Sequence, residues 1–129
     1  MTESSQESFY DAVGGRPTFE LIVDVFYQHV AADPVLKAMY PEEDLGPAAE
    51  RLTLFLMQYW GGPTTYSERR GHPRLRMRHV PYAVDDDARA RWLAAFRAGL
   101  DAADLEPEHD AQFWAYAQHA AQFMVNTPS

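Results

Sequence analysis

The feature that most limits the fold of this chain is a repeated spacing of apolar residues by three and four positions. Between residues 19 and 30 this spacing is followed by Phe19, Ile22, Val23, Phe26, Tyr27 and Val30. Comparable faces recur in residues 47–60, 85–100 and 107–126. Such spacing gathers apolar side chains on one side of an α-helix, and no useful stretch alternates as a β-strand would. We therefore predict an all-α protein with about four long helices.

Glycines, prolines and short polar side chains predict where the helices begin and end. Gly14–Gly15 indicates a corner after a short helix, and Thr18 is expected to cap the long helix that follows. Asp33, directly before a proline, is expected to cap a further short helical turn. Residues 61–63, Gly-Gly-Pro, end the next long helix, and Pro107 opens the last one.

Length, charge and composition limit the class of protein. The 129 residues are expected to form a flexible tail over residues 1–8 and a single domain over residues 9–126. A formal net charge of −8 argues against binding to nucleic acid or to an anionic membrane. The absence of cysteine excludes thiolate zinc sites, iron–sulfur clusters, disulfides and covalently attached haem. With no targeting segment and no apolar run long enough to span a membrane, we expect a cytoplasmic protein.

A basic stretch interrupts this acidic chain. Residues 69–78 contain five of the eleven Lys and Arg residues, and His79 follows directly. Pro73 and Pro81 leave room for at most one short turn between them. If that turn is helical, His79 faces inward with Leu75 and Met77, and the arginines point outward.

Two interpretations of this stretch remain open, and the residues alone favour the second. In the first, a planar cofactor such as haem would use the histidine on its metal, the apolar side chains on its face and the arginines on its carboxylates. In the second, the stretch is a solvated turn with an ordinary surface histidine. No two of the five histidines are spaced as a close ligand pair, so a zinc site is not expected.

Several segments together resemble the group II truncated haemoglobins. They are YDAVGG, VFYQHV, LKAMYPEEDL and RLTLFLMQYWGGPTTYSERRGHPRLRMRHVPY, together with the helix that carries Trp92. The resemblance extends over residues 9–126 and is most specific over residues 59–82. It implies a truncated globin with a two-over-two helical sandwich, in which a loop and a turn replace the helix before the proximal histidine.

The resemblance also implies a haem site. His79 would be the iron ligand, and Tyr27, Tyr40 and Trp92 would be the catalytic hydrogen-bond donors on the opposite face. Ala48 stands where many globins carry a distal histidine or glutamine. The other residues expected to contact the cofactor are Arg51, Leu52, Phe55, Leu56, Tyr66, Leu75, Met77 and Arg78.

The function implied by this resemblance is haem-based. Haem b, that is iron protoporphyrin IX bound non-covalently, would bind dioxygen, CO, NO and peroxide and release oxygen slowly. One hypothesis is an enzyme in which haem-bound oxygen or peroxide reacts with NO or oxidises an external donor. Such an enzyme would need a separate and unknown reductase or electron donor. The alternative is a non-catalytic module for oxygen storage, transport or sensing. A haem-free helical interaction domain is a third interpretation, and a homodimer is possible in this family.

Overall fold

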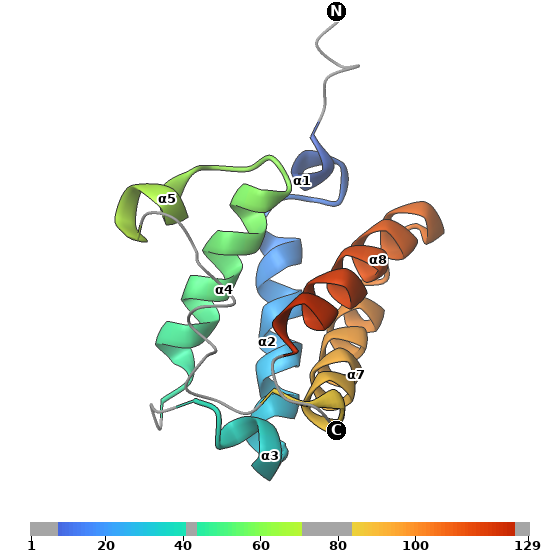
Figure 1. The fold of residues 1–129 in the computed structure, drawn as a ribbon. Helices are drawn as coiled ribbons and strands as arrows, with labels where there is room; N and C mark the ends of the chain where they lie inside the picture. Colours follow the sequence, from blue (N-terminus) through green and yellow to red (C-terminus); the bar gives the residue numbers. More distant parts are fainter. Residues whose placement is uncertain (1–7, 41–43, 71–83, 126–129) are drawn as a thin grey trace, which may run out of the picture.

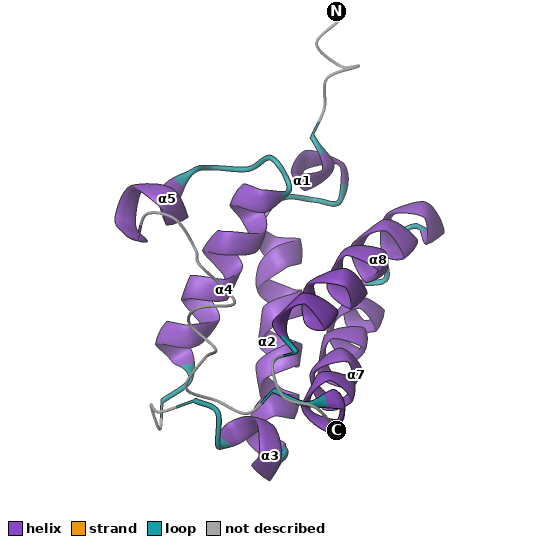
Figure 2. Cartoon of the chain, viewed as in Figure 1, coloured by secondary structure: helices purple, strands orange, loops and turns teal. Residues whose placement is uncertain are grey.

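The computed structural model describes residues 8–40, 44–70 and 84–125, and these residues are helical with no strand (Figure 2). The helices are α1 (Phe9–Ala12), α2 (Arg16–Ala32), α3 (Pro34–Lys37), α4 (Gly46–Tyr59), α5 (Thr65–Arg70), α7 (Asp86–Ala103) and α8 (Pro107–Met124). The prediction of an all-α protein is confirmed. Within the described ranges, no helix is both long and apolar enough to cross a membrane.

The four long helices form two layers (Figure 1). One layer contains α2 and α4, the other contains α7 and α8, and α2 makes its most extensive contact with α7. The short helices α1, α3 and α5 lie at the ends of the first layer (Figure 1). This arrangement agrees with the two-over-two sandwich that the sequence resemblance implies.

The apolar face expected in residues 19–30 forms the centre of the core. Phe19, Ile22, Phe26 and Val30 are each 0% exposed. Burying a side chain of this size contributes about 1.5 to 3 kcal/mol relative to leaving it in water. This face packs against α7 and α8 and therefore contributes substantially to apolar stabilisation.

Gly99 allows α7 to approach α2 closely. A Cβ atom at this position would lie 2.5 Å from the carbonyl oxygen of Ile22. Any larger residue would force the two backbones apart, because that neighbour is main chain and cannot rotate away. The most extensive helix interface of the fold therefore depends on a residue without a side chain.

The helix starts follow the predicted signals with one correction. Asp33 caps α3 as predicted, since its carboxylate accepts hydrogen bonds from the backbone N–H groups of Val35 and Leu36. The cap of α2 is Gly15 and not Thr18, whose hydroxyl donates to the carbonyl of Val13 at 2.7 Å. The expectation for Thr18 was wrong because the helix already begins at Arg16, which places Thr18 inside its first turn.

A short helix lies within the long connection that precedes residue 81. This helix, α5, is tied to α4 by Gln58, whose side-chain amide donates to the Ser67 hydroxyl at 2.6 Å and accepts from the Ser67 backbone N–H at 2.9 Å. Six residues are too few to establish a helical period, so the sequence did not predict α5. Residues 71–83, including most of the basic stretch, lie outside the described residues.

Candidate functional site

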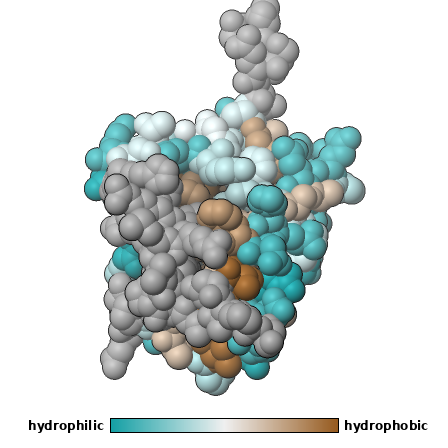
Figure 3. Space-filling model, viewed as in Figure 1, coloured by the Kyte–Doolittle hydropathy of each residue, from teal (hydrophilic) through white to brown (hydrophobic). Residues whose placement is uncertain are grey.

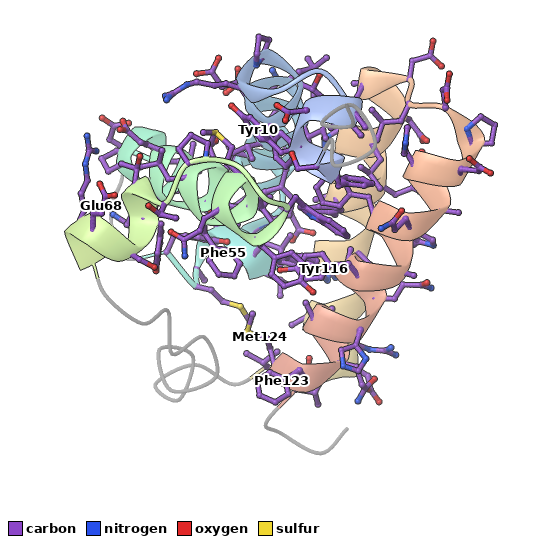
Figure 4. The ribbon with its side chains drawn as sticks, turned by 90° about the horizontal axis from the view of Figure 1, so that it is seen from above. Tyr10, Phe55, Glu68, Tyr116, Phe123 and Met124 are labelled. Atoms are coloured by element: carbon purple, nitrogen blue, oxygen red, sulfur yellow. The ribbon has the colours of Figure 1, made fainter. Side chains whose placement is uncertain are left out.

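A cavity of about 190 Å³ lies between the two helix layers. Phe55 on α4 and Tyr116 on α8 border it from the two layers, and in Figure 4 Tyr116 points from α8 towards α4. Hydrophobic residues also gather near the centre of the face shown in Figure 3, bordered on the side of α8 by hydrophilic residues. The cavity is lined by Tyr27, Tyr40, Ala48, Arg51, Leu52, Phe55, Leu56, Tyr66, Trp92, Phe96, Tyr116, Ala120 and Met124.

Every predicted site residue that the structure describes lines this cavity. The set is contributed by α2, the turn after α3, α4, α5 and α7, and comprises Tyr27, Tyr40, Arg51, Leu52, Phe55, Leu56, Tyr66 and Trp92. Helix packing thus brings together side chains that are far apart in the sequence. The predicted iron ligand His79, with Leu75, Met77 and Arg78, lies outside the described residues.

Two tyrosines form the polar corner of the cavity. The rings of Tyr27 and Tyr40 meet edge to face, with centroids 5.5 Å apart and an interplanar angle of 77°, and their side chains are hydrogen-bonded. Burial raises the pKa of the Tyr40 phenol, and the hydrogen bond with Tyr27 and the positive charge of Arg51 lower it only in part. Because the net effect is a raised pKa, Tyr40 keeps its proton at neutral pH and can donate a hydrogen bond.

Phe26 packs against two of the polar aromatic side chains, Tyr27 and Trp92. Its buried ring meets Tyr27 edge-on with centroids 4.9 Å apart and meets Trp92 with centroids 5.4 Å apart. The Trp92 indole also stacks on Phe96, with a centroid distance of 5.2 Å and an interplanar angle of 12°. These contacts hold the Tyr27 and Trp92 rings in place, which lowers the entropic cost of aiming their polar groups at a ligand.

The remaining walls of the cavity are largely apolar. Leu56 is buried, and the Phe55 ring packs against the Tyr66 ring with centroids 5.5 Å apart. Ala48 is 4% exposed and presents only a methyl group to the cavity. A hydrogen-bonding ligand therefore meets polar groups mainly at the corner formed by the aromatic donors.

Arg51 lies at the boundary between the cavity and a second groove. The groove is lined by residues of α4 and α5, and Tyr66, Glu50 and Arg69 also border it. Arg69 and Glu50 form an exposed ion pair with an N–O distance of 3.5 Å. Arg51 therefore places positive charge at the edge of an apolar cavity, where an anionic group on a bound molecule would meet it.

Some lining residues were missed by sequence reasoning. Phe96, Tyr116, Ala120 and Met124 were expected on the apolar faces of the last two helices, without a role in the site. Periodicity indicates that such residues face inward, but it does not tell whether they face another helix or an open space.

The profile of the family described as bacterial-like globin matches residues 8–126. This chain belongs to the bacterial-like globin family. The globin is similar to a thermostable hemoglobin from the actinobacterium Thermobifida fusca, with 60% identity and a TM-score of 0.93 over 95% of this chain and 100% of that one.

Other relatives place the globin within one group of the truncated haemoglobins. It is 38% identical to the group 2 truncated hemoglobin YjbI of Bacillus subtilis, over 91% of this chain and 87% of that protein. The group II truncated hemoglobin of Bacillus anthracis matches with 34% identity and a TM-score of 0.90, over 95% of this chain and 98% of that one. The predicted recognition as a group II truncated haemoglobin and the two-over-two fold are confirmed.

Membership in this family implies a haem cofactor and, in general terms, the binding of oxygen and other diatomic gases. The lining of the cavity fits such a group. Apolar side chains such as Leu52 and Phe55 suit a flat macrocycle, Arg51 suits an anionic edge, and Tyr40 supplies a protonated donor. The donor set of this globin is therefore compatible with the cofactor of its family.

Proposed function

We propose that this globin holds haem b non-covalently through His79, binds dioxygen with slow release, and carries out redox chemistry with oxygen, peroxide or NO. The observation that supports the proposal most is the convergence of Tyr27, Tyr40 and Trp92 on one cavity with largely apolar walls. When bound, the haem would supply an iron at which such small ligands coordinate and exchange electrons.

The residues proposed to hold the haem come from two sources. Arg51 and Tyr66 border both the cavity and the second groove, which suits contacts with the propionate groups. His79 and Arg78 belong to the segment over residues 59–82 that most resembles the family. The same segment supplies Leu75 and Met77, proposed to pack on the macrocycle.

The polar aromatic residues account for the proposed slow release of oxygen. A hydrogen bond to a charged acceptor contributes on the order of 1.5 to 3 kcal/mol, which corresponds to roughly 10- to 150-fold in ligand retention. The apolar walls around Tyr27, Tyr40 and Trp92 exclude water that would compete for these bonds. Two or three such bonds would keep oxygen bound far longer than a site without donors.

Slow release favours redox chemistry, sensing or scavenging over delivery of oxygen. We therefore place the redox enzyme first and oxygen storage, transport or sensing second. The enzyme would need an external electron donor. Repeated turnover with peroxide or NO at a fixed supply of reductant would support the enzyme, whereas a single stoichiometric reaction per haem would support the binding module.

The first test is a haem titration of the purified protein, followed by reduction and exposure to oxygen. We expect a Soret band that saturates at one haem per chain and a stable oxygenated spectrum. His79→Ala should abolish or strongly alter this spectrum, while His29→Ala, at an exposed position on α2, should leave it unchanged. A folded protein that takes up no haem, or a His79→Ala variant with the wild-type spectrum, would contradict the proposal.

A further inference from the structure

Met124 places a thioether side chain on the wall of the cavity. It is the last residue of α8 and follows the other cavity-lining residues of that helix, Tyr116 and Ala120, at successive steps of four residues. In Figure 4, Met124 lies on the side of Phe55 and Tyr116. Its neighbour Phe123 is 55% exposed and does not line the cavity. The helical period of α8 therefore turns the thioether, and not the adjacent ring, towards the site.

We propose that Met124 is a modification site, at which peroxide in the cavity oxidises the thioether to a sulfoxide and thereby weakens the hold on haem. This inference rests on the haem binding and the peroxide chemistry proposed above. Among the described residues that line the cavity, Met124 is the only one that contains sulfur. A thioether sulfur carries lone pairs and accepts an oxygen atom in a single two-electron step.

The other methionines of the described ranges are placed less favourably for this reaction. Met57 is 2% exposed and belongs to the hydrophobic core, and Met39 is half-buried before the start of α4. Neither lines the cavity. Oxygen transfer requires contact between the sulfur and the reacting oxygen atom. A thioether on the wall of the cavity should therefore react ahead of one that meets peroxide only from solution.

The reaction balances with hydrogen peroxide as its single oxidant. The O–O bond of the peroxide breaks, one oxygen atom bonds to Sδ of Met124, and the other leaves as water with both protons of the peroxide. The sulfur loses two electrons and the peroxide gains two. Because no reductant is consumed, this oxidation competes with the oxidation of an external donor and prevails when that donor is exhausted.

A sulfoxide at this position conflicts with the wall around it. Phe96 and Ala120 make the neighbouring wall apolar, and a polar S=O group placed there without a hydrogen-bond donor is destabilising. The end of α8 offers relief. Directly after Met124, the Val125 backbone N–H donates to the carbonyl of Gln122 at 3.2 Å. Outward movement of this last turn breaks few helical bonds and brings the sulfoxide into water, but it opens the cavity. Haem should then leave faster.

The modification would be reversible. Methionine sulfoxide reductases convert the sulfoxide back to the thioether. Met124 is partly exposed at a helix end, so such an enzyme needs access only to the last turn of α8. The site would thus link the retention of haem to the balance between peroxide and reducing donor.

The first test treats the haem-loaded protein with one equivalent of peroxide and no donor, and follows the gain of an oxygen atom at each methionine by peptide mass spectrometry. We expect Met124 to be oxidised first. Cyanide bound to the ferric iron keeps the haem in place but blocks peroxide, and it should suppress this oxidation. Earlier oxidation of Met39, Met57 or Met77, or an unchanged rate at Met124 with cyanide, overturns the inference and leaves the proposed function standing.

The second test measures the rate of haem transfer to an excess of apomyoglobin before and after peroxide treatment. Oxidation should speed transfer by roughly 5- to 150-fold, and treatment with methionine sulfoxide reductases should restore the slow rate. Met124→Leu keeps a side chain of similar size without sulfur, so its transfer should stay slow after peroxide. Met39→Leu is the matched control and should behave as the wild type does.

Two further outcomes separate this inference from the proposed function. An unchanged transfer rate once Met124 is oxidised, or equal acceleration in Met124→Leu, overturns the inference alone. Peroxide consumption is followed in the same samples, and its absence in the haem-loaded wild type overturns the proposed peroxide chemistry and this inference together.

Discussion

Tyr27 on α2 and Tyr40 after α3 share a hydrogen bond at the polar corner of the cavity. The bond lowers the pKa of Tyr40, although burial, the larger effect, leaves that pKa raised overall. A hydrogen bond lowers the pKa of a phenol when the phenol oxygen accepts it, because the deprotonated form is then stabilised. The Tyr27 hydroxyl is therefore placed to stabilise the Tyr40 phenolate, and both hydroxyls belong to residues that line the cavity.

This arrangement predicts that both tyrosines slow the release of oxygen. Tyr40→Phe removes one donor and should speed oxygen release by roughly 10- to 150-fold. Tyr27→Phe should also speed release, because it removes a second hydroxyl that lines the cavity. Stopped-flow measurement of oxygen dissociation checks both variants. Oxygen release at the wild-type rate in either variant would remove that tyrosine from the donor set.

Trp92→Phe should also speed oxygen release markedly. The substitution removes the indole N–H group but keeps an aromatic ring to pack on Phe96 and Phe26. Trp114→Phe is the control, because Trp114 on α8 packs against Arg97 of α7 and does not line the cavity. The same dissociation measurement applies, and equal rates for Trp92→Phe and the wild type would remove Trp92 from the donor set.

The hydrogen bond between the tyrosines also predicts an alkaline titration. In the wild type, burial keeps the pKa of Tyr40 above the ordinary value. Tyr27→Phe removes a group that stabilises the phenolate, so the pKa of Tyr40 should rise further. Carbon-13 NMR of proteins labelled at the tyrosine Cζ position can follow the phenol as pH is raised. A downward shift of the Tyr40 pKa in Tyr27→Phe would show that Tyr27 does not stabilise the Tyr40 phenolate.

Asp33 should contribute to stability in a pH-dependent manner. Burial raises the pKa of its carboxyl, but hydrogen bonds from Arg91 and from the backbone N–H groups of Leu36 and Val35 outweigh burial, so the pKa is lowered. A lowered pKa in the folded state stabilises the protein at pH values above the unfolded pKa, and this stabilisation is lost as pH falls through the folded pKa.

The stability difference between the wild type and Asp33→Asn should therefore be largest near neutral pH and should shrink below about pH 4. Chemical unfolding at a series of pH values measures this difference. Asp24→Asn, at an exposed position on α2, is the control and should change stability little across the series. A difference for Asp33→Asn that does not change with pH would mean that Asp33 acts through helix geometry and not through its charge.

Gly99→Ala should destabilise the fold by about 1 to 3 kcal/mol, because the added methyl group would overlap the Ile22 carbonyl oxygen. Thermal unfolding should show a lower Tm. Gly46→Ala is the comparison, since its new Cβ would meet only the carboxylate of Asp44, with the nearest oxygen at 3.1 Å, and this side chain can rotate away. If both variants kept the wild-type Tm, α2 and α7 would be able to separate slightly without cost.

Local sequence signals predicted the long helices well, because spacing and capping depend on neighbours within a few residues. Phe19 to Val30 followed one helical face, and Asp33 and Pro107 marked helix starts. Such signals failed where several overlapped or where an element was short. The start of α2 was placed too late, at Thr18, and α5 was not predicted.

By itself the sequence determined the helical fold class, the family resemblance and the aromatic residues to examine, because apolar period, helix caps and family motifs are properties of contiguous residues. Only the tertiary structure decided that Tyr27, Tyr40 and Trp92 share one cavity, and that Tyr116 lines this cavity while its ring contacts Tyr59. These contacts depend on the offset and rotation of helices distant in the chain, which are set by how their side chains pack and not by local preference.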